Sequence, residues 1–271
     1  MSKLKIGVSG CSGKMGIAIL NLINKSEECS IGGGLESSES HTLGQNLGNL
    51  INDNTIDLKI TADRELFFSH SDIIIDFSSP ESTSQNIDFA KNNKKSIVIG
   101  TTGLSKKTEE KISEASESIP IIYSANMSIG VNILFGLTRK LSSMLNEDDF
   151  DIEILEMHHK DKVDSPSGTA IAIGKSAAQG RNIDLSSHSE ISREGIDCKR
   201  KKGNIGFASL RGGSVTGDHT VIFSSMHERL EIRHIAEDRS LFASGALKAA
   251  IWLYGQNAGL YSMKDVLNIN L

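Results

Sequence analysis

Two adjacent histidines and two lysines form the densest group of ionisable side chains in the sequence. His158, His159, Lys160 and Lys162 fall within one short segment of the 271-residue chain. An imidazole titrates near neutral pH, so it is suited to giving or accepting a proton during a reaction. Ammonium groups bind carboxylates through charge-assisted hydrogen bonds. This combination predicts proton-transfer chemistry on a small, negatively charged molecule.

The elements on either side of this segment would direct its side chains toward one point. The apolar run at 152–155 predicts a strand, and residues 170–178 predict a helix that follows a Ser-Pro-Ser-Gly-Thr turn. A helix start offers unpaired backbone N–H groups and a positive dipole end, which together bind anions. A simpler interpretation stays open: because neighbouring strand residues point to opposite faces, His158 could lie in the core and His159 on the surface.

A glycine turn near the N-terminus indicates a dinucleotide-binding fold. A short apolar strand, Leu4–Ser9, leads into this turn, and a helical pattern follows it. Gly10 permits the sharp turn, Gly13 lets a pyrophosphate approach the backbone, and Gly16 lets the helix pack closely on the sheet. A second strand ends at Glu36, where an acid typically accepts hydrogen bonds from the adenosine ribose. The spacing is G-x-x-G-x-x-G, so the strand, helix and acid around it carry the prediction.

Later strand ends repeat this pattern of small and polar residues. Strands predicted at 72–78, 96–99 and 120–123 each end in hydroxyl, amide or glycine groups, which would lie on the ligand-binding edge of a parallel sheet. Threonine and asparagine also serve ordinary turns, so each is an expected contact and no more. Cys11 is expected to be a small filler rather than a reactive thiol. The expected cofactor contacts are Gly10, Cys11, Ser12, Gly13, Lys14, Met15, Glu36, Gly100, Thr101, Thr102, Ala125, Asn126, Met127 and Ser128.

The second half of the chain predicts a further domain. A helical stripe runs from Val131 to Leu145, and the segments 206–210, 220–223 and 231–235 alternate apolar and polar residues as antiparallel strands do. Residues 43–54 are expected to form a loop. The chain becomes helical again from Ser240, and the residues expected to share the buried face of that helix are Leu241, Ala243, Leu247, Ala250, Ile251 and Tyr254.

The predicted fold is therefore α/β with two domains. Residues 1–128 and 239–271 would form a Rossmann-like dinucleotide-binding domain. Residues 129–238 would form an inserted α+β domain with an open mixed sheet, used for substrate binding and oligomerisation. This arrangement predicts a cleft between the bound cofactor and the loop that contains His158.

Composition restricts the class of protein. Hydrophobic content of 38%, 23% charged residues and 25 glycines are typical of a soluble α/β protein. No apolar run reaches the roughly 18 residues of a membrane span, and no apolar signal-peptide segment follows the N-terminus, so a cytoplasmic protein is expected. Three cysteines without paired spacing fit a reducing compartment and predict no metal site. A net charge of −5 argues against nucleic-acid binding, and the basic run 199–202 is expected to be a solvated loop.

The combined motifs resemble the 4-hydroxy-tetrahydrodipicolinate reductase (dihydrodipicolinate reductase) family of lysine and diaminopimelate biosynthesis, nearly from end to end. The glycine turn and the segments 100–103 and 125–128 fall in the family's order. The residues that carry the resemblance most specifically are Glu156, His158, His159, Lys162 and Asp164–Ala170, then Gly206–Gly213, then Gly217–Thr220.

This resemblance implies an enzyme that uses NADH or NADPH to reduce a cyclic imine dicarboxylate. By position in the motif, His158 is similar to the family's general acid and Lys162 to a second proton donor. His159, Gly168 and Thr169 match the substrate-binding residues. The resemblance also implies a homotetramer assembled through the sheet of the substrate domain.

Two departures from the family pattern are visible. Many members follow the ribose-binding acid with an arginine suited to a 2′-phosphate, whereas Ser37 follows Glu36 here, so NADH is expected to serve at least as well as NADPH. Asp161 stands where some relatives are more basic, and it would either tune Lys162 or face solvent.

Three rival functions stay open. They are a metal hydrolase using His158, His159 and Asp164, a different Rossmann-type reductase, and a non-enzymatic dinucleotide sensor. The density of proton donors in one loop argues against the sensor.

Overall fold

The computed structural model describes residues 2–269, which divide into two compact units. The first unit comprises residues 2–129 with Ser240–Asn268, and the second comprises Gly130–Arg239 with Ile269. The second unit is thus an insertion in the first, with boundaries one residue from those expected at 128 and 239. Residues 1, 270 and 271, which the predicted ranges include, lie outside the described residues.

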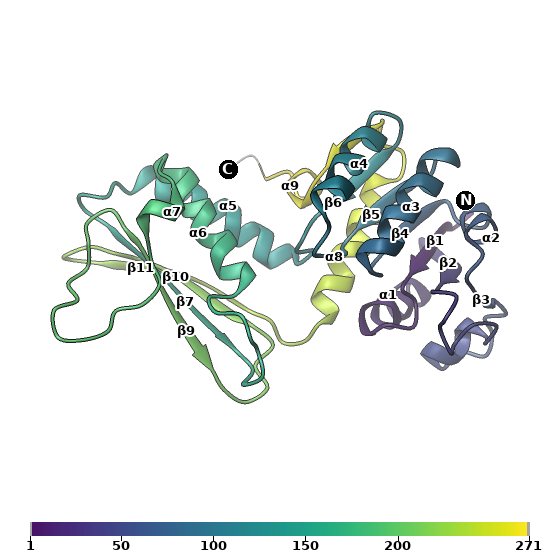
Figure 1. The fold of residues 1–271 in the computed structure, drawn as a ribbon, viewed down its shortest axis with the longest axis horizontal. Coiled ribbons are helices and arrows are strands. Elements are labelled where there is room, and N and C mark those ends of the chain that lie inside the picture. Colours follow the sequence, from purple (N-terminus) through teal and green to yellow (C-terminus); the bar gives the residue numbers. More distant parts are fainter. Residues whose placement is uncertain (1, 270–271) are drawn as a thin grey trace. The chain divides into compact units, whose positions relative to one another are not determined.

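The first unit contains a seven-stranded parallel sheet in the order β12-β6-β5-β4-β1-β2-β3 (Figure 1). Apart from β12, this is the strand order of a dinucleotide-binding fold. The strands are β1 (Leu4–Ser9), β2 (Cys29–Leu35), β3 (Ile60–Thr61), β4 (Ile73–Asp76), β5 (Ser96–Ile99), β6 (Pro120–Tyr123) and β12 (Gly259–Tyr261). The helices are α1 (Lys14–Asn24), η1 (Leu47–Ile51), α2 (Arg64–Ser69), α3 (Pro80–Asn92), α4 (Lys106–Ser116), α8 (Ser240–Leu253) and α9 (Met263–Val266).

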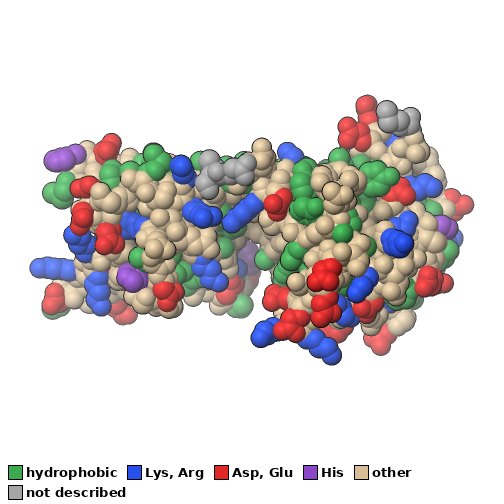
Figure 2. Space-filling view, turned by 90° about the horizontal axis from the view of Figure 1, so that it is seen from above, with side chains coloured by type: hydrophobic (Ala, Val, Ile, Leu, Met, Phe, Trp, Pro, Cys, Tyr) green, Lys and Arg blue, Asp and Glu red, His purple; other side chains and the backbone are tan. Residues whose placement is uncertain are grey.

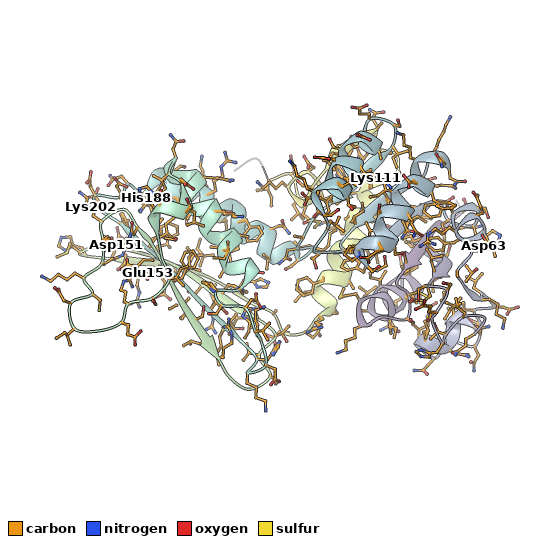
Figure 3. All side chains as sticks on the ribbon, viewed as in Figure 1. Asp63, Lys111, Asp151, Glu153, His188 and Lys202 are labelled. Carbon is orange, nitrogen blue, oxygen red and sulfur yellow. The ribbon has the colours of Figure 1, made fainter. Side chains whose placement is uncertain are left out.

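Side-chain caps start several of these helices, including the three that cover the parallel sheet between β3 and β6 in the chain, α2, α3 and α4. Asp63, Ser79 and Ser105 each accept a hydrogen bond from a first-turn N–H group of α2, α3 and α4 (Asp63 is labelled in Figure 3). A cap of this kind is worth about 1 kcal/mol. All three cap residues can be seen in the sequence as an Asp or Ser directly before the helix start. The loop predicted at 43–54 was wrong in part, because it contains the short 3₁₀ helix η1, capped by Asn46.

The prediction of the buried face of α8 was wrong in part, since Ala243 and Ala250 are buried as predicted but Ile251 and Tyr254 are not. Ile251 and Tyr254 are 38% and 57% exposed, while the buried residues are Ala243, Gly245, Ala246, Ala249, Ala250 and Leu253. A Cβ atom on Gly245 would lie 1.7 Å from the carbonyl oxygen of Met127. Because the backbone of α8 approaches its neighbours this closely, glycine and alanine occupy most of the inner face, with Leu253 at its end.

The second unit contains a five-stranded mixed sheet in the order β11-β10-β7-β9-β8 (Figure 1). Its strands are β7 (Asp151–His158), β8 (Ser189–Glu190), β9 (Ile205–Arg211), β10 (Asp218–Ser224) and β11 (Arg229–Ile235), and its helices are α5 (Ile129–Met144), α6 (Gly168–Arg181) and α7 (Leu185–His188). β10 is antiparallel to β7 and β11, as predicted. β9 is instead parallel to β7, because α6 lies in the connection between them and a parallel pair needs such a crossover.

The two faces of this sheet differ in how deeply their side chains are buried. On one face Ile152 and Ile154 of β7 are buried with Ile173 of α6 and Phe207 of β9. Because side chains alternate along a strand, Glu156 and His158 lie on that same covered face. Leu155 and Met157 lie on the opposite face.

Candidate active site

A buried carboxylate contacts the imidazole of His158 at the end of β7. Nδ1 of His158 lies 2.5 Å from Oε2 of Glu156, whose side chain is 1% exposed. Arg211 at the end of β9 donates to both oxygens of this carboxylate, at 2.9 Å each. The backbone N–H of Ser167 donates to Oε1 at 3.2 Å. Glu156 therefore has a polar partner on each oxygen despite its burial.

These donors keep Glu156 ionised. Burial by itself would raise the pKa of Glu156, but hydrogen bonds from Arg211, His158 and Ser209 bring it down to about 2. An ionised carboxylate can only accept, so the Nδ1–H group of His158 donates to it. Nε2 is then the ring nitrogen that faces away from Glu156.

A second histidine lies against the first. The rings of His158 and His219 meet edge to face, with centroids 5.1 Å apart. Burial lowers the pKa of His219 to about 4, helped by the proximity of His158, so His219 is neutral at pH 7. Nε2 of His219 lies 3.2 Å from Oγ of Ser167. A Cβ atom on Gly217 would lie 2.9 Å from Nε2 of His158, so glycine leaves room beside that nitrogen.

Lys162 contacts a different carboxylate near the start of α6. Its Nζ lies 2.7 Å from Oδ1 of Asp164. The hydrogen bond from Lys162 lowers the pKa of Asp164, and the backbone of Gly168 contributes in the same direction. A cation and a helix-start amide thus converge on one carboxylate. Asp161 is exposed and no ion pair is found for it among the described residues, which favours the interpretation that it faces solvent.

The start of α6 is set by Ser167, which caps the helix by accepting a hydrogen bond from the Ala170 N–H at 3.1 Å. Gly168 and Thr169 form the first turn, and nothing lies within 4 Å of the place where a Cβ atom on Gly168 would be. The backbone N–H of Ser167 also donates to Glu156. The first turn of α6 therefore begins one residue after a group that contacts the carboxylate bound to His158.

His159 lies apart from His158. It lines a groove of about 640 Å³ with Lys160, Asp161, Gly213, Ser214, Thr216 and Arg239. The groove is positively charged on balance, since its lining holds Lys160 and Arg239 against Asp161. Of the two adjacent histidines, His158 is therefore buried and His159 is more exposed, as the simpler interpretation of the sequence predicts. His158 makes the buried polar contacts.

The glycine turn of the first unit has the geometry of a nucleotide cradle. Gly10 has φ = +76°, and a Cβ there would lie 2.6 Å from the Phe77 carbonyl oxygen. A Cβ on Gly16 would lie 2.1 Å from the Gly10 carbonyl oxygen. α1 starts at Gly13 with no side-chain cap, unlike α2, α3, α4 and α6. Its free first-turn amides suit a phosphate, so the residues present fit a dinucleotide.

Glu36 reaches this turn from the end of β2. Its Oε1 accepts hydrogen bonds from the N–H and the hydroxyl of Ser12, at 2.8 and 2.7 Å. Cys11 beside it is fully buried, and burial, with the charge of Glu36, raises its pKa to about 12. The thiol is therefore a filler, as expected. Lys14 is exposed.

The other expected cofactor contacts lie at the carboxyl ends of neighbouring strands. A Cβ on Gly100 would lie 2.2 Å from the ring of Phe77, so the ends of β4 and β5 touch. The Thr101 hydroxyl accepts from the Ser78 N–H at 3.2 Å, and Oδ1 of Asn126 accepts from the Ser128 N–H at 2.9 Å. These side chains stabilise the turns. The residues with exposed or half-buried positions are Met15, Thr102, Ala125 and Asn126, while Met127 and Ser128 are buried.

Two cations of the basic run at 199–202 form ion pairs with carboxylates. Arg200 lies 3.0 Å from both Asp151 and Glu153, and Lys202 pairs with Asp148. Asp151, Glu153 and Lys202 are labelled in Figure 3. On the face shown in Figure 2, Lys and Arg side chains alternate with Asp and Glu side chains. A polyanion at this run would have to displace those carboxylates.

Metal ligation and membrane insertion find no support in residues 2–269. No group of three His, Cys, Asp or Glu residues there is arranged to hold a metal ion, and Asp164 pairs with Lys162. The metal-hydrolase alternative therefore loses its proposed ligand set. No helix in this range is long and apolar enough to cross a membrane.

Comparisons with known proteins decide the family. Residues 4–127 match the family described as dihydrodipicolinate reductase, N-terminus, and residues 130–267 match its C-terminus. The chain belongs to the dihydrodipicolinate reductase family. A relative in this family from Rhodopseudomonas palustris (strain BisA53), named 4-hydroxy-tetrahydrodipicolinate reductase, is 47% identical over 99% of this chain and 98% of its own. Another of the same name, from Parvibaculum lavamentivorans, is 48% identical over 98% of each chain.

Solved structures confirm the fold. A dihydrodipicolinate reductase from Paenisporosarcina sp. TG-14 with dipicolinate bound has a TM-score of 0.75 at 21% identity, covering 96% of this chain and 98% of its own. A myo-inositol dehydrogenase from Corynebacterium glutamicum has a TM-score of 0.57 at 12% identity, covering 99% and 93%. The predicted class, a Rossmann-like domain with an inserted mixed-sheet domain, is correct.

Sequence reasoning missed several side chains around His158. Glu156 and Arg211 stood inside the motifs that carried the resemblance but were given no role, and Ser167 and His219 were likewise passed over. One signal was available: Glu156 and His158 are two residues apart on a predicted strand, so they share a face. The pairing of His158 with Arg211 needed the strand register.

Proposed function

We propose that this chain reduces 4-hydroxy-tetrahydrodipicolinate to tetrahydrodipicolinate with NADH or NADPH, in lysine and diaminopimelate biosynthesis. The observation that carries the proposal is the 47% identity, over almost the whole of both chains, to a relative of that name. The geometry agrees with it. A nucleotide cradle occupies one unit, and the other unit holds an imidazole beside a carboxylate, together with an ammonium group near a helix start.

The dinucleotide would lie along the carboxyl edge of the parallel sheet. The turn Gly10–Met15 would hold its pyrophosphate at the free amides of α1, and Glu36 would bond the adenosine ribose. The turns at 100–102 and 125–128 would border the nicotinamide end. The bound cofactor supplies the hydride.

Glu36 also supports use of NADH. Its carboxylate is fixed against Ser12, and the next residue is Ser37 rather than a cation. A 2′-phosphate near that carboxylate would meet a like charge, whereas the ribose diol of NADH would find an acceptor in Oε2. NADH should therefore serve at least as well as NADPH.

The substrate's carboxylates would be bound by the second unit. Lys162, His159 and the backbone donors of Gly168 and Thr169 offer charge-assisted hydrogen bonds to a small dianion. Nζ of Lys162 pairs with the Asp164 carboxylate, so a carboxylate of the substrate would have to displace Asp164 from Lys162. His158 would give the proton that balances the hydride, and Lys162 would serve as a second donor. General acid catalysis contributes roughly 10²- to 10⁴-fold.

The test is an absorbance assay at the reduced-nicotinamide band with enzymatically generated substrate. His158→Ala and Lys162→Ala should each lower kcat by about 10²-fold or more, and NADH should give a kcat/KM at least equal to that of NADPH. The control is Lys111→Ala. Lys111, labelled in Figure 3, pairs with Asp88 on the first unit, and its substitution should leave kcat unchanged.

Several results would count against the proposal. Activity on a substrate without two carboxylates, and none on this one, would indicate another Rossmann-type reductase. Dinucleotide binding with no turnover of any candidate would indicate a sensor. A much higher kcat/KM with NADPH would contradict the role given to Glu36.

We further propose a cytoplasmic homotetramer. Free cysteines at 11, 29 and 198 suit a reducing compartment. The open face of the mixed sheet carries exposed apolar side chains, including Leu210 and Ile235 at 49% and 47% exposure. Met157, Asp218, Leu210 and Ile235 follow one cross-strand row on that face, which would bury well against another copy.

A further inference from the structure

We infer that Glu156 and Arg211 are positioning residues that orient His158 so that Nε2 carries the transferred proton. The inference rests on the proposed role of His158 as the acid. Neither residue would touch the substrate. Each would act through the imidazole.

Strand geometry places the three side chains together. Glu156 and His158 are two residues apart on β7 and so point to the same face, while Arg211 on β9 is the register partner of His158. The contacts follow: Nδ1 to Oε2 at 2.5 Å, and Arg211 to both carboxylate oxygens at 2.9 Å. The sheet backbone therefore fixes all three positions before any ligand binds.

The protonation pattern follows from these contacts. The carboxylate is ionised and can only accept, so Nδ1 carries a proton in both the neutral and the charged imidazole. Nε2 alone gains and loses a proton. After Nε2–H gives its proton to the substrate, the neutral ring keeps the Nδ1–H bond to Glu156. Gly217 leaves space beside Nε2, as a Cβ there would lie 2.9 Å away.

Arg211 fixes the carboxylate itself. Two parallel hydrogen bonds set the plane of the Glu156 carboxylate, and the Ser167 N–H adds a third donor at Oε1. Oε1 thus receives two backbone or guanidinium donors, and Oε2 receives Arg211 and His158. Each oxygen has two donors, but among the four only His158 can change its tautomer and accept a hydrogen bond instead. This difference predicts what an amide would do in the same place.

Glu156→Gln tests the inference. The amide oxygen should take the Oε1 position, because the Ser167 N–H and Arg211 there can only donate, so that the NH₂ group takes the Oε2 position and donates to Nδ1 of His158. The neutral imidazole would then carry its proton on Nε2. We expect ¹⁵N NMR of the substrate-free protein to show this change of tautomer. We also expect kcat to fall by about 10²-fold, with little change in KM, and activity to be lost at a lower pH than in wild type.

The matched control is Glu153→Gln. Glu153 lies on the same strand but on the opposite face, and it pairs with Arg193 at 2.6 Å and Arg200 at 3.0 Å (Figure 3). Its substitution removes an equally well-bonded carboxylate from β7. The His158 tautomer should stay as in wild type, and kcat should stay within about twofold, a size typical of surface changes.

Arg211→Lys covers the case in which Glu156→Gln does not fold. It keeps the charge but loses the bidentate bonds, so we expect a smaller fall in kcat in the same direction and a broadened His158 signal. A folded Glu156→Gln protein, or in its absence Arg211→Lys, with the wild-type tautomer, kcat and pH profile would overturn the inference. If the tautomer changes but wild-type protein reduces no substrate, the positioning role stands and the proposed function fails.

Discussion

At the scale of single residues, the site depends on side chains whose charge is set by burial. Glu156 stays ionised because three donors outweigh its desolvation, whereas His219 stays neutral because it has no such compensation. The two groups lie on the same covered face of the sheet, within reach of His158. One face of a sheet thus holds a fixed negative charge and a neutral imidazole on either side of the proposed acid.

The neutrality of His219 predicts a pH dependence of stability. Its pKa is about 4 in the folded protein, against an ordinary value of 6.5 for histidine, so the unfolded chain binds more protons between these values. Stability from this group is complete above pH 6.5 and is lost as the pH falls toward 4. A pKa lowered from 6.5 to about 4 on folding corresponds to about 3 kcal/mol in the free energy of unfolding. His219→Gln should remove most of this slope in denaturant titrations at about pH 7 and about pH 4.5.

His41→Gln is the control for this measurement, since His41 is exposed. It should keep the wild-type slope. An unchanged slope in His219→Gln would mean that acid destabilisation has another source, such as His234, whose pKa burial also lowers.

At the scale of elements, α8 shows how packing distance selects residues. The helix has two apolar sides, and size decides between them. Alanine and glycine line the inner side because α8 lies against α1 and the sheet strands, and the larger Ile251 and Tyr254 stay outside. Apolar periodicity alone therefore placed Ala243 and Ala250 correctly but also assigned Ile251 and Tyr254 to the buried side.

Gly245→Ala tests this close approach. In an open helix the change would stabilise by about 1 kcal/mol through propensity. Here the new Cβ would meet the Met127 carbonyl oxygen at 1.7 Å, so we expect a loss of at least about 2 kcal/mol in the free energy of unfolding. Ser244→Ala on the exposed side of the same helix is the control, expected within about 0.5 kcal/mol of wild type. A stabilised Gly245→Ala protein would contradict the packing described here.

At the scale of the whole molecule, each unit contributes one reagent of the proposed reaction. The unit with the parallel sheet would hold the hydride donor, and the unit with the mixed sheet would supply the proposed proton donor and the expected ligands of the substrate's carboxylates. The open face of the mixed sheet remains for assembly with other copies.

Leu210→Lys tests the proposed assembly. A lysine that replaces the exposed Leu210 of this row would be buried against the other copy and should break the interface, so light scattering after size exclusion should give a smaller species than wild type. Leu66→Lys is the control, because Leu66 is similarly exposed at 46% but lies on α2 of the first unit. Equal masses for wild type and both variants would mean that this face of the sheet is not part of the tetramer interface.

Much of the fold was determined by sequence alone. The glycine turn, the runs of buried isoleucine and the order of small-residue strand ends are local signals, because each depends on residues close together in the chain. They sufficed for the Rossmann-like domain, the insertion and the family. His158, Lys162 and the start of α6 were found in the same way, as one contiguous segment; their roles stay predictions.

Only the tertiary structure decided which groups surround His158. Arg211 and His219 lie 53 and 61 positions further along the chain, and strand register brings them to the imidazole. The parallel pairing of β9 and the inner side of α8 were also decided there. In each case the deciding quantity is a distance between segments that are remote in sequence, and residue patterns within a segment carry no information on such a distance.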